Sequence, residues 1–310
     1  MKTIKLVSRR SFARGLLVLG FAAAAAFAEA PAVKADAAVE LDQTWLVSPE
    51  DARALIADGA LVLDTRSAKL QKKHPLPGAV DTQWMVFSKE AKPPFMGLLA
   101  DDAALSAKFQ ELGVSADMPV IAVGDTLGGW GEDGRIVWTL RSRGHTAAVM
   151  VDGGYGALVE GGVPEIQATA TPGNWVAEYD GSLEATAEEV QAAMSQDNVI
   201  LLDTREPREY AGKTPYGETR GGHVPGAEHL YYKDFFGEDG KLLEETELRA
   251  KLAELGVDAD TKVIAYCTGG VRSGYFTGVL QNIGIDAQNY AGSMWDWSSK
   301  PESDFPLETN

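Results

Sequence analysis

Cysteine is nearly missing from this sequence, which contains a single one, Cys267, among its 310 residues. One thiol excludes an intrachain disulfide, because a disulfide joins two cysteines. A lone cysteine is either a small apolar core residue or a reactive thiol. The residues around Cys267 decide between these two roles.

Positive charge is scarce as well. The sequence has 28 Lys and Arg against 45 Asp and Glu, which gives a net charge of −17. An acidic surface of this kind repels nucleic acid and anionic lipid, so neither is expected as a partner. A small anionic substrate needs a local positive pocket, because the long-range field of the protein opposes its approach.

Long apolar runs are limited to the uncharged stretch 15–28. Two lysines and the pair Arg9-Arg10 precede this stretch, and small residues follow it. A cationic head before an apolar run shorter than about 18 residues is typical of a secretory signal and not of a spanning helix. The sequence predicts that residues 1–35 form a leader of the twin-arginine type. We therefore expect a periplasmic protein without a stable membrane anchor, in a compartment where a lone thiol meets oxidants.

The chain contains an internal repeat. Four blocks recur in the same order: 48–58 as 186–195, 61–66 as 200–205, 74–79 as 223–227, and 111–123 as 254–266. Shared blocks in one order predict two copies of one domain. We assign residues 36–166 to the first domain, 167–182 to a linker and 183–310 to the second domain.

Each copy alternates short apolar runs with amphipathic stretches. Runs such as 199–202 and 263–266 are typical of strands buried on both faces. The amphipathic stretches predict helices at 103–112, 135–143, 245–255 and 273–282. Strands alternating with helices predict an α/β fold in which each domain is a parallel sheet flanked by helices on both faces. Active sites in such sheets lie beyond the carboxyl ends of the strands.

The second copy places its cysteine at such a carboxyl end. The strand 263–266 runs directly into Cys267-Thr268-Gly269-Gly270-Val271-Arg272, and a helix is predicted from about Ser273. Two glycines let the backbone curl so that successive amide N–H groups point inward and form a cradle for an anion. The helix N-terminus and Arg272 add positive charge, which favours the thiolate and lowers the pKa of Cys267. This order of features favours a nucleophile beside an anion pocket over a buried core cysteine.

These motifs resemble those of the two-domain rhodanese sulfurtransferases. That family combines an Asp-x-Arg after a strand, a Gly-His-x-Pro-Gly-Ala turn, and a six-residue loop that opens with cysteine in the second domain only. The corresponding segments are Asp203-Thr204-Arg205, Gly222-His223-Val224-Pro225-Gly226-Ala227 and Cys267 to Arg272, and the resemblance covers about residues 45–305. It implies two tandem rhodanese-like domains, of which the second is catalytic.

The resemblance also implies a reaction, the transfer of a sulfane sulfur through a persulfide on Cys267. The partners are then a small anionic sulfur donor and a thiol or cyanide acceptor, with neither a metal nor an organic cofactor. Family members that act on thiosulfate often have two basic residues just after the cysteine, whereas Thr268-Gly269-Gly270 contains none. Arg272 restores one positive charge, and thiosulfate is available outside the cytoplasm. We therefore expect thiosulfate as the donor, with 3-mercaptopyruvate as the alternative.

Two further functions are compatible with the loop. Cysteine phosphatases and arsenate reductases hold an oxyanion in a Cys-x5-Arg loop, but four residues separate Cys267 from Arg272. The smaller loop suits a sulfur atom better than a phosphoryl group. A sulfur or chalcogen carrier would load Cys267 but turn over slowly with free donor and acceptor.

The candidates for substrate binding are the residues that follow Cys267 and one further basic residue, Arg220. The loop candidates are Thr268, Gly269, Gly270, Val271 and Arg272. Arg220 precedes the Gly-His turn, where the resemblance places a substrate-binding arginine.

Several polar residues of the second copy are interpreted as structural support. Asp203, Arg205 and Glu209 are tempting as acid, base and anion ligand, but the first copy keeps Asp64 and Arg66 without any thiol. A buried structural ion pair is therefore the better interpretation. His223 is likewise interpreted as architectural, since the first copy repeats it and its spacing to the next histidine suits no simple metal motif.

The equivalent loop of the first copy, residues 124–135, has Gly124 or Asp125 in place of the cysteine. It cannot form a persulfide, so we expect it to support the interface and one wall of the cleft. Its acids lack the spacing of a calcium-binding loop. The tryptophans are interpreted as core or interdomain packing and not as a nucleic-acid platform: Trp130, Trp138, Trp295 and Trp297.

Overall fold

The computed structural model describes residues 40–168 and 171–309. The predicted leader, residues 1–35, lies outside this range. Within the described range, no helix combines the length and the apolar composition that crossing a bilayer requires.

The N-terminal elements form a five-stranded parallel sheet with the strand order β1-β5-β4-β2-β3. We call the segment from β1 to α5 the first half. Its elements are β1 (Leu46–Val47), α1 (Pro49–Ala57), β2 (Leu61–Asp64), α2 (Ala68–Lys73), β3 (Val80–Asp81), the 3₁₀ helix η1 (Trp84–Phe87), α3 (Asp102–Glu111), β4 (Val120–Val123), α4 (Glu132–Arg141), β5 (Ala148–Val151) and α5 (Gly154–Glu160).

The C-terminal elements form a four-stranded parallel sheet with the strand order β7-β6-β8-β9. We call the segment from α6 to α10 the second half. Its elements are α6 (Ala187–Ala193), β6 (Val199–Asp203), α7 (Pro207–Tyr210), β7 (Glu228–His229), the 3₁₀ helix η2 (Tyr232–Phe235), α8 (Glu245–Glu254), β8 (Lys262–Tyr266), α9 (Val271–Asn282), β9 (Ala287–Asn289) and α10 (Ser293–Trp297).

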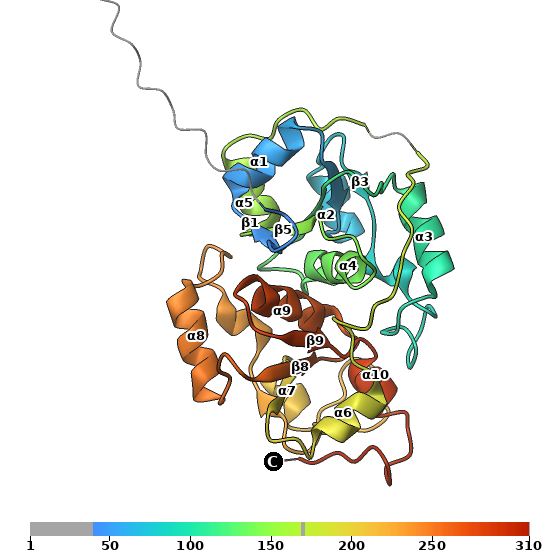
Figure 1. Ribbon diagram of the computed structural model, residues 1–310, viewed down its shortest axis with the longest axis vertical. Coiled ribbons are helices and arrows are strands. Elements are labelled where there is room, and N and C mark those ends of the chain that lie inside the picture. Colours follow the sequence, from blue (N-terminus) through green and yellow to red (C-terminus); the bar gives the residue numbers. More distant parts are fainter. Residues whose placement is uncertain (1–39, 169–170, 310) are drawn as a thin grey trace, which may run out of the picture. The chain divides into compact units, whose positions relative to one another are not determined.

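The two halves repeat one order of elements, which confirms the predicted α/β class and the tandem arrangement. From α1 onward, each helix and strand of the first half has a counterpart from α6 onward, and β4 and β8 occupy equivalent inner positions. The predicted boundaries at 36–166, 167–182 and 183–310 stay predictions. Figure 1 shows the repeat in colour, blue to green for the first half and yellow to red for the second.

Local sequence explains where the elements begin. Ser48 caps α1, its hydroxyl accepting the Asp51 N–H at 3.1 Å, and a proline occupies the first turn. Thr186 and Glu189 form a capping box at α6. Strands β2, β4 and β5 are buried along their whole length. This agrees with a parallel sheet covered on both faces.

Helices α4 and α9 bring the two halves together and lie side by side in Figure 1. Gly134 permits this close approach, because a Cβ built there would lie 2.4 Å from the Tyr275 Cα. Polar contacts add to the packing. The Trp138 Nε1–H donates to the Leu183 carbonyl at 2.8 Å, and the Tyr232 hydroxyl donates to the Gly129 carbonyl at 2.7 Å. The first half therefore reaches the neighbourhood of β8 and of the residues that follow it.

Candidate active site

Cys267 follows β8 directly and stands at the carboxyl edge of the second sheet. We call residues 267–272 the Cys267 loop. Gly270 is the N-cap of α9 and has a φ of 75°, a left-handed conformation that favours glycine. Helix α9 begins at Val271, two residues before the predicted start at Ser273. Arg272 therefore belongs to the first turn of the helix, which fixes its backbone more firmly than a loop would.

The Cys267 sulfur is surrounded by backbone donors. The side chain is buried, and the Gly270 N–H donates to Sγ at 3.1 Å. Burial alone raises the pKa of the thiol, but the charge of Arg272 and hydrogen bonds from the Ser273 and Gly269 N–H groups outweigh it, so the pKa of Cys267 is lowered. The predicted anion cradle is thus present, with the cysteine sulfur as its occupant.

The lowered pKa leads to a measurable pH profile. Alkylation of Cys267 by iodoacetamide is expected to reach half of its plateau rate below pH 9.0, the ordinary pKa of a cysteine thiol, because the thiolate is the reacting species. The rate is measured by mass spectrometry at a series of pH values, with Cys267→Ser as the blank. A half-plateau at or above pH 9.0 would contradict the stabilised thiolate.

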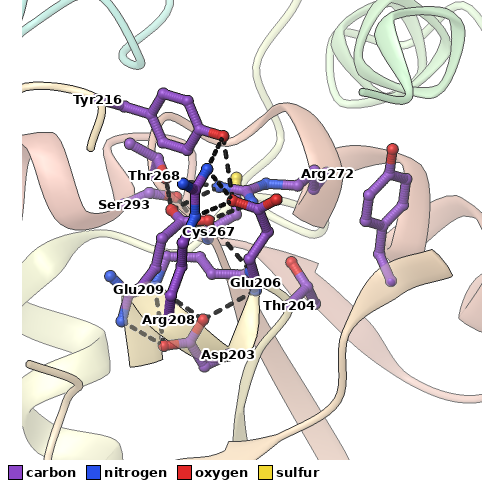
Figure 2. A network of polar contacts seen from close by, with 12 residues as sticks. Asp203, Thr204, Glu206, Arg208, Glu209, Tyr216, Cys267, Thr268, Arg272 and Ser293 are labelled. Atoms are coloured by element: carbon purple, nitrogen blue, oxygen red, sulfur yellow. Dashed lines mark hydrogen bonds and ion pairs between the residues drawn. The ribbon is translucent and has the colours of Figure 1, made fainter. Parts of the chain in front are cut away.

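A buried ion pair stands beside the thiolate. The Arg272 Nη1 and Nη2 atoms lie 2.6 and 2.9 Å from the two carboxylate oxygens of Glu209, in a bidentate geometry. The Thr268 hydroxyl lies 2.5 Å from both partners. Burial raises the pKa of Glu209, but the hydrogen bonds and charge of Arg272 outweigh it, so that pKa is lowered. Figure 2 shows Glu209, Thr268 and Arg272 gathered around Cys267.

The Cys267 loop faces a pocket of about 140 Å³. Its lining includes Cys267, Thr268, Gly269, Val271 and Arg272, which the sequence singled out, and Trp84, Trp130, Tyr216 and Trp295. Trp130 packs across the two halves as expected, with 5.6 Å between its ring centroid and that of Tyr216, and Trp138 and Trp297 are fully buried. Trp130 and Trp295 also line the pocket, a position that the sequence did not predict. Trp84 and Tyr216 were missed, because neither stands in a recognisable motif.

Arg220 has structural partners. Its guanidinium donates to the carbonyls of Ser298, Trp297, Lys300 and Phe305 at 2.9–3.2 Å, at the C-terminal end of α10. It does not belong to the lining of the pocket beside Cys267. The proposed role of Arg220 in donor binding stays a prediction, while its contacts hold the chain after α10.

Asp203 and Arg205 form a buried bidentate pair at the end of β6. The Arg205 Nη2 lies 2.6 Å from the Asp203 Oδ2 and 2.8 Å from the Gly222 carbonyl. Asp64 and Arg66 repeat the pair in the first half, with 2.6 Å between the same atoms. The same geometry with and without a nearby thiol agrees with the predicted supporting role.

His223 packs within the second half. Its ring stacks on Tyr210, with 3.7 Å between the ring centroids, and its Nδ1 lies 3.0 Å from the Tyr210 carbonyl. The side chain is buried, and a glutamate, Glu308, approaches its Nε2 at 3.4 Å. Within residues 40–168 and 171–309, no three His, Cys, Asp or Glu side chains group as metal ligands.

In the first half, the space that corresponds to the Cys267 side chain is filled by the carboxyl group of Asp133. Gly124 follows β4 as Cys267 follows β8, and Asp133 is the second residue of α4 as Arg272 is of α9. A Cβ built at Gly124 would lie 2.4 Å from the Asp133 Cγ. The Asp133 Oδ1 accepts the Gly134 N–H at 2.9 Å, and burial raises the pKa of this carboxyl to about 7. The inactive loop is therefore filled by its own side chain.

Comparison with known proteins adds sequence evidence to this geometry. The rhodanese-like domain model matches residues 186–300. The thiosulfate sulfurtransferase of Pseudomonas aeruginosa is 30% identical over 276 residues, which cover 86% of this chain and 98% of that protein. A probable 3-mercaptopyruvate sulfurtransferase of the same organism is 30% identical, covering 66% of this chain and 72% of that protein.

A solved structure supports the fold. The anaerobic ergothioneine biosynthesis enzyme of Chlorobium limicola matches with a TM-score of 0.73 and 19% identity, covering 87% of this chain and 70% of that one. Its low identity makes this a likeness of fold alone. The match to the thiosulfate sulfurtransferase of Pseudomonas aeruginosa, by contrast, is a similarity of sequence, and it extends over both halves. The chain belongs to the rhodanese family of sulfurtransferases.

Proposed function

We propose that this protein is a thiosulfate sulfurtransferase that carries the transferred sulfur as a persulfide on Cys267. One observation carries the proposal. The Cys267 sulfur accepts hydrogen bonds from amide N–H groups beside Arg272, and Cys267 is one of the residues that line a pocket of about 140 Å³. A stabilised thiolate at a pocket wall is a nucleophile that a bound donor can reach.

The reaction then needs two displacements at sulfur. The Cys267 thiolate attacks the outer sulfur of thiosulfate, a new S–S bond forms, and the S–S bond of the donor breaks with its electron pair leaving on sulfite. An acceptor nucleophile, cyanide or a thiolate, attacks the outer sulfur of the persulfide and restores the Cys267 thiolate. The loop amides and Arg272 stabilise the anionic sulfur on both sides of each step.

The donor 3-mercaptopyruvate is the second candidate, and the pocket supplies an observation in its favour. Among the residues that the structure describes, Arg272 is the only basic one in the lining, and Glu209 already balances its charge. A singly charged carboxylate donor is therefore easier to accommodate than a dianion. Thiosulfate remains the first choice because the Pseudomonas aeruginosa protein, which matches 86% of this chain, is named a thiosulfate sulfurtransferase.

Intact-protein mass spectrometry separates these donors. After incubation with thiosulfate and removal of excess donor, the wild type is expected to gain the mass of one sulfur atom, and Cys267→Ser to gain nothing. Parallel incubation with 3-mercaptopyruvate ranks the two donors by their rates of loading. If neither donor adds sulfur to a folded wild-type protein, the proposal fails.

The same samples test the remaining alternatives. A sulfur or chalcogen carrier would load Cys267 and then release sulfur to free cyanide or thiol only slowly, so the discharge rate is measured on the loaded protein. A phosphatase or arsenate reductase would act on its oxyanion substrate without any persulfide. Four residues between Cys267 and Arg272 disfavour that reaction, because the shorter loop offers fewer amides to three phosphoryl oxygens.

We also propose that the protein works in the periplasm. The support comes from the sequence of residues 1–35, where paired arginines precede a short apolar stretch. A persulfide enzyme in that compartment would draw on donors outside the cytoplasm.

A further inference from the structure

Arg135 of α4 is a buried cation whose hydrogen-bond partners are backbone carbonyls. It is 1% exposed, and its fork binds two backbone carbonyls, Nη1 to Gly270 at 3.0 Å and Nη2 to Gly97 at 2.6 Å. Among the described residues, no carboxylate forms an ion pair with it. Burial lowers the pKa of Arg135 to about 10, which leaves it charged at neutral pH. Its charge is therefore not balanced as that of Arg272 is.

The Gly270 carbonyl that Arg135 binds belongs to the Cys267 loop. The same carbonyl accepts the Asn289 Nδ2–H at 3.1 Å, while the Gly270 N–H donates to the Cys267 Sγ at 3.1 Å. A Cβ built at Gly270 would lie 2.5 Å from the Arg135 Nη1. The glycine is thus held between the sulfur on one side and the guanidinium on the other.

The second carbonyl ties the loop to the first half. Gly97 packs so closely that a Cβ built there would lie 2.6 Å from the Ala291 carbonyl oxygen and 3.1 Å from the Gly269 Cα. Arg135 therefore joins the segment around Gly97 to the Cys267 loop through one planar group. A guanidinium can do this because its donors have a fixed fork geometry.

We propose that Arg135 is a positioning residue for sulfur transfer, through which the first half holds the Gly270 peptide and keeps the loop amides directed at the Cys267 sulfur. The inference rests on the proposed function, because it assumes that Cys267 carries the transferred sulfur. It gives the first half a reason to lie beside the Cys267 loop. Arg135 itself does not belong to the lining of the pocket, so it acts on the chemistry through the Gly270 peptide. The guanidinium also interacts electrostatically with Cys267.

The test compares two methionine variants of α4. Arg135→Met removes the fork from the Cys267 loop. Arg141→Met is the matched control, because Arg141 is also buried and binds carbonyls, including those of Ala148 at 2.7 Å and Asp42 at 3.0 Å, but among the described residues it has no hydrogen bond to the Cys267 loop. The half-plateau pH of Cys267 alkylation is expected to rise by about one unit in Arg135→Met and to stay unchanged in Arg141→Met. Below that pH, alkylation and sulfur loading should both fall about tenfold in Arg135→Met.

Equal profiles for the two folded variants and the wild type would overturn the inference. If Arg135→Met does not fold, Arg135→Lys replaces it. An ammonium group lacks the fork that binds both carbonyls, so a raised half-plateau pH is again expected, and a wild-type profile overturns the inference. Alkylation requires no sulfur donor, so the comparison remains valid if thiosulfate and 3-mercaptopyruvate both fail to load the wild type. Failure of the proposed function and failure of this inference are thereby separate results.

Discussion

Replacing Arg272 with glutamine is expected to lower kcat/KM for sulfur transfer by about 10²–10³-fold, the effect of removing a charge-stabilising donor from an active site. Two losses act together. The thiolate loses the positive charge that lowers its pKa, and the buried Glu209 carboxylate is left without its bidentate partner at 2.6 and 2.9 Å. The uncompensated carboxylate then repels the thiolate, so the pKa of Cys267 should rise. Steady-state kinetics and the pH profile of Cys267 alkylation measure both effects.

Glu209→Gln is the matched control for this result. It breaks the same ion pair, so both variants lose stability, by about 3–5 kcal/mol if the remaining charge stays buried. The charge left behind has the opposite sign, however, because Arg272 now faces the thiolate without Glu209 to balance it. We expect the pKa of Cys267 to fall in Glu209→Gln and to rise in Arg272→Gln. Shifts in the same direction would contradict the electrostatic account of this site.

Asp203→Asn is expected to destabilise the protein by about 3–5 kcal/mol, because it leaves Arg205 buried and charged without a counterion. Asp64→Asn should cost a similar amount, since Arg66 and Asp64 repeat the same 2.6 Å contact. The measurement is chemical denaturation followed separately in each variant. The alkylation profile of Cys267 should stay close to wild type in both variants at temperatures where they are folded.

These paired variants separate architecture from catalysis. A large loss of kcat/KM in folded Asp203→Asn, with none in folded Asp64→Asn, would show that Asp203 takes part in the chemistry. Equal destabilisation with retained activity would instead assign both aspartates to the framework. The comparison is informative because the chain supplies its own internal control.

Local patterns predicted the features that depend on neighbours in the sequence. The buried strand before Cys267, the glycine turn after it and the helix that follows all come from one continuous segment, so spacing alone placed the thiol at the edge of the sheet. The start of α9 at Val271 was missed by two residues. The expected amphipathic character of 273–282 was also wrong, because α9 is buried on every side from Val271 to Leu280. The first turn of the helix is set by Gly270 and its φ of 75°.

Contacts between distant segments were beyond such patterns. Trp84 and Tyr216 line the pocket from segments that carry no motif, and Arg135 reaches the Cys267 loop from the other half. Arg220 was singled out by its position before the Gly-His turn of the family resemblance, and the structure shows that it binds carbonyls after α10. A side chain of this length can serve either of two surroundings, and only the tertiary structure shows which one it meets.

The carboxyl group of Asp133 prevents a single substitution from restoring a reactive thiol to the first half. A Gly124→Cys exchange alone would drive the new side chain into that group, and any thiol that fitted would face a carboxyl group whose pKa is about 7 instead of a guanidinium. At least two coordinated changes are required before selection could favour the intermediate. Asp133 therefore keeps the first half in its supporting role, because replacing Gly124 alone cannot restore a reactive thiol there.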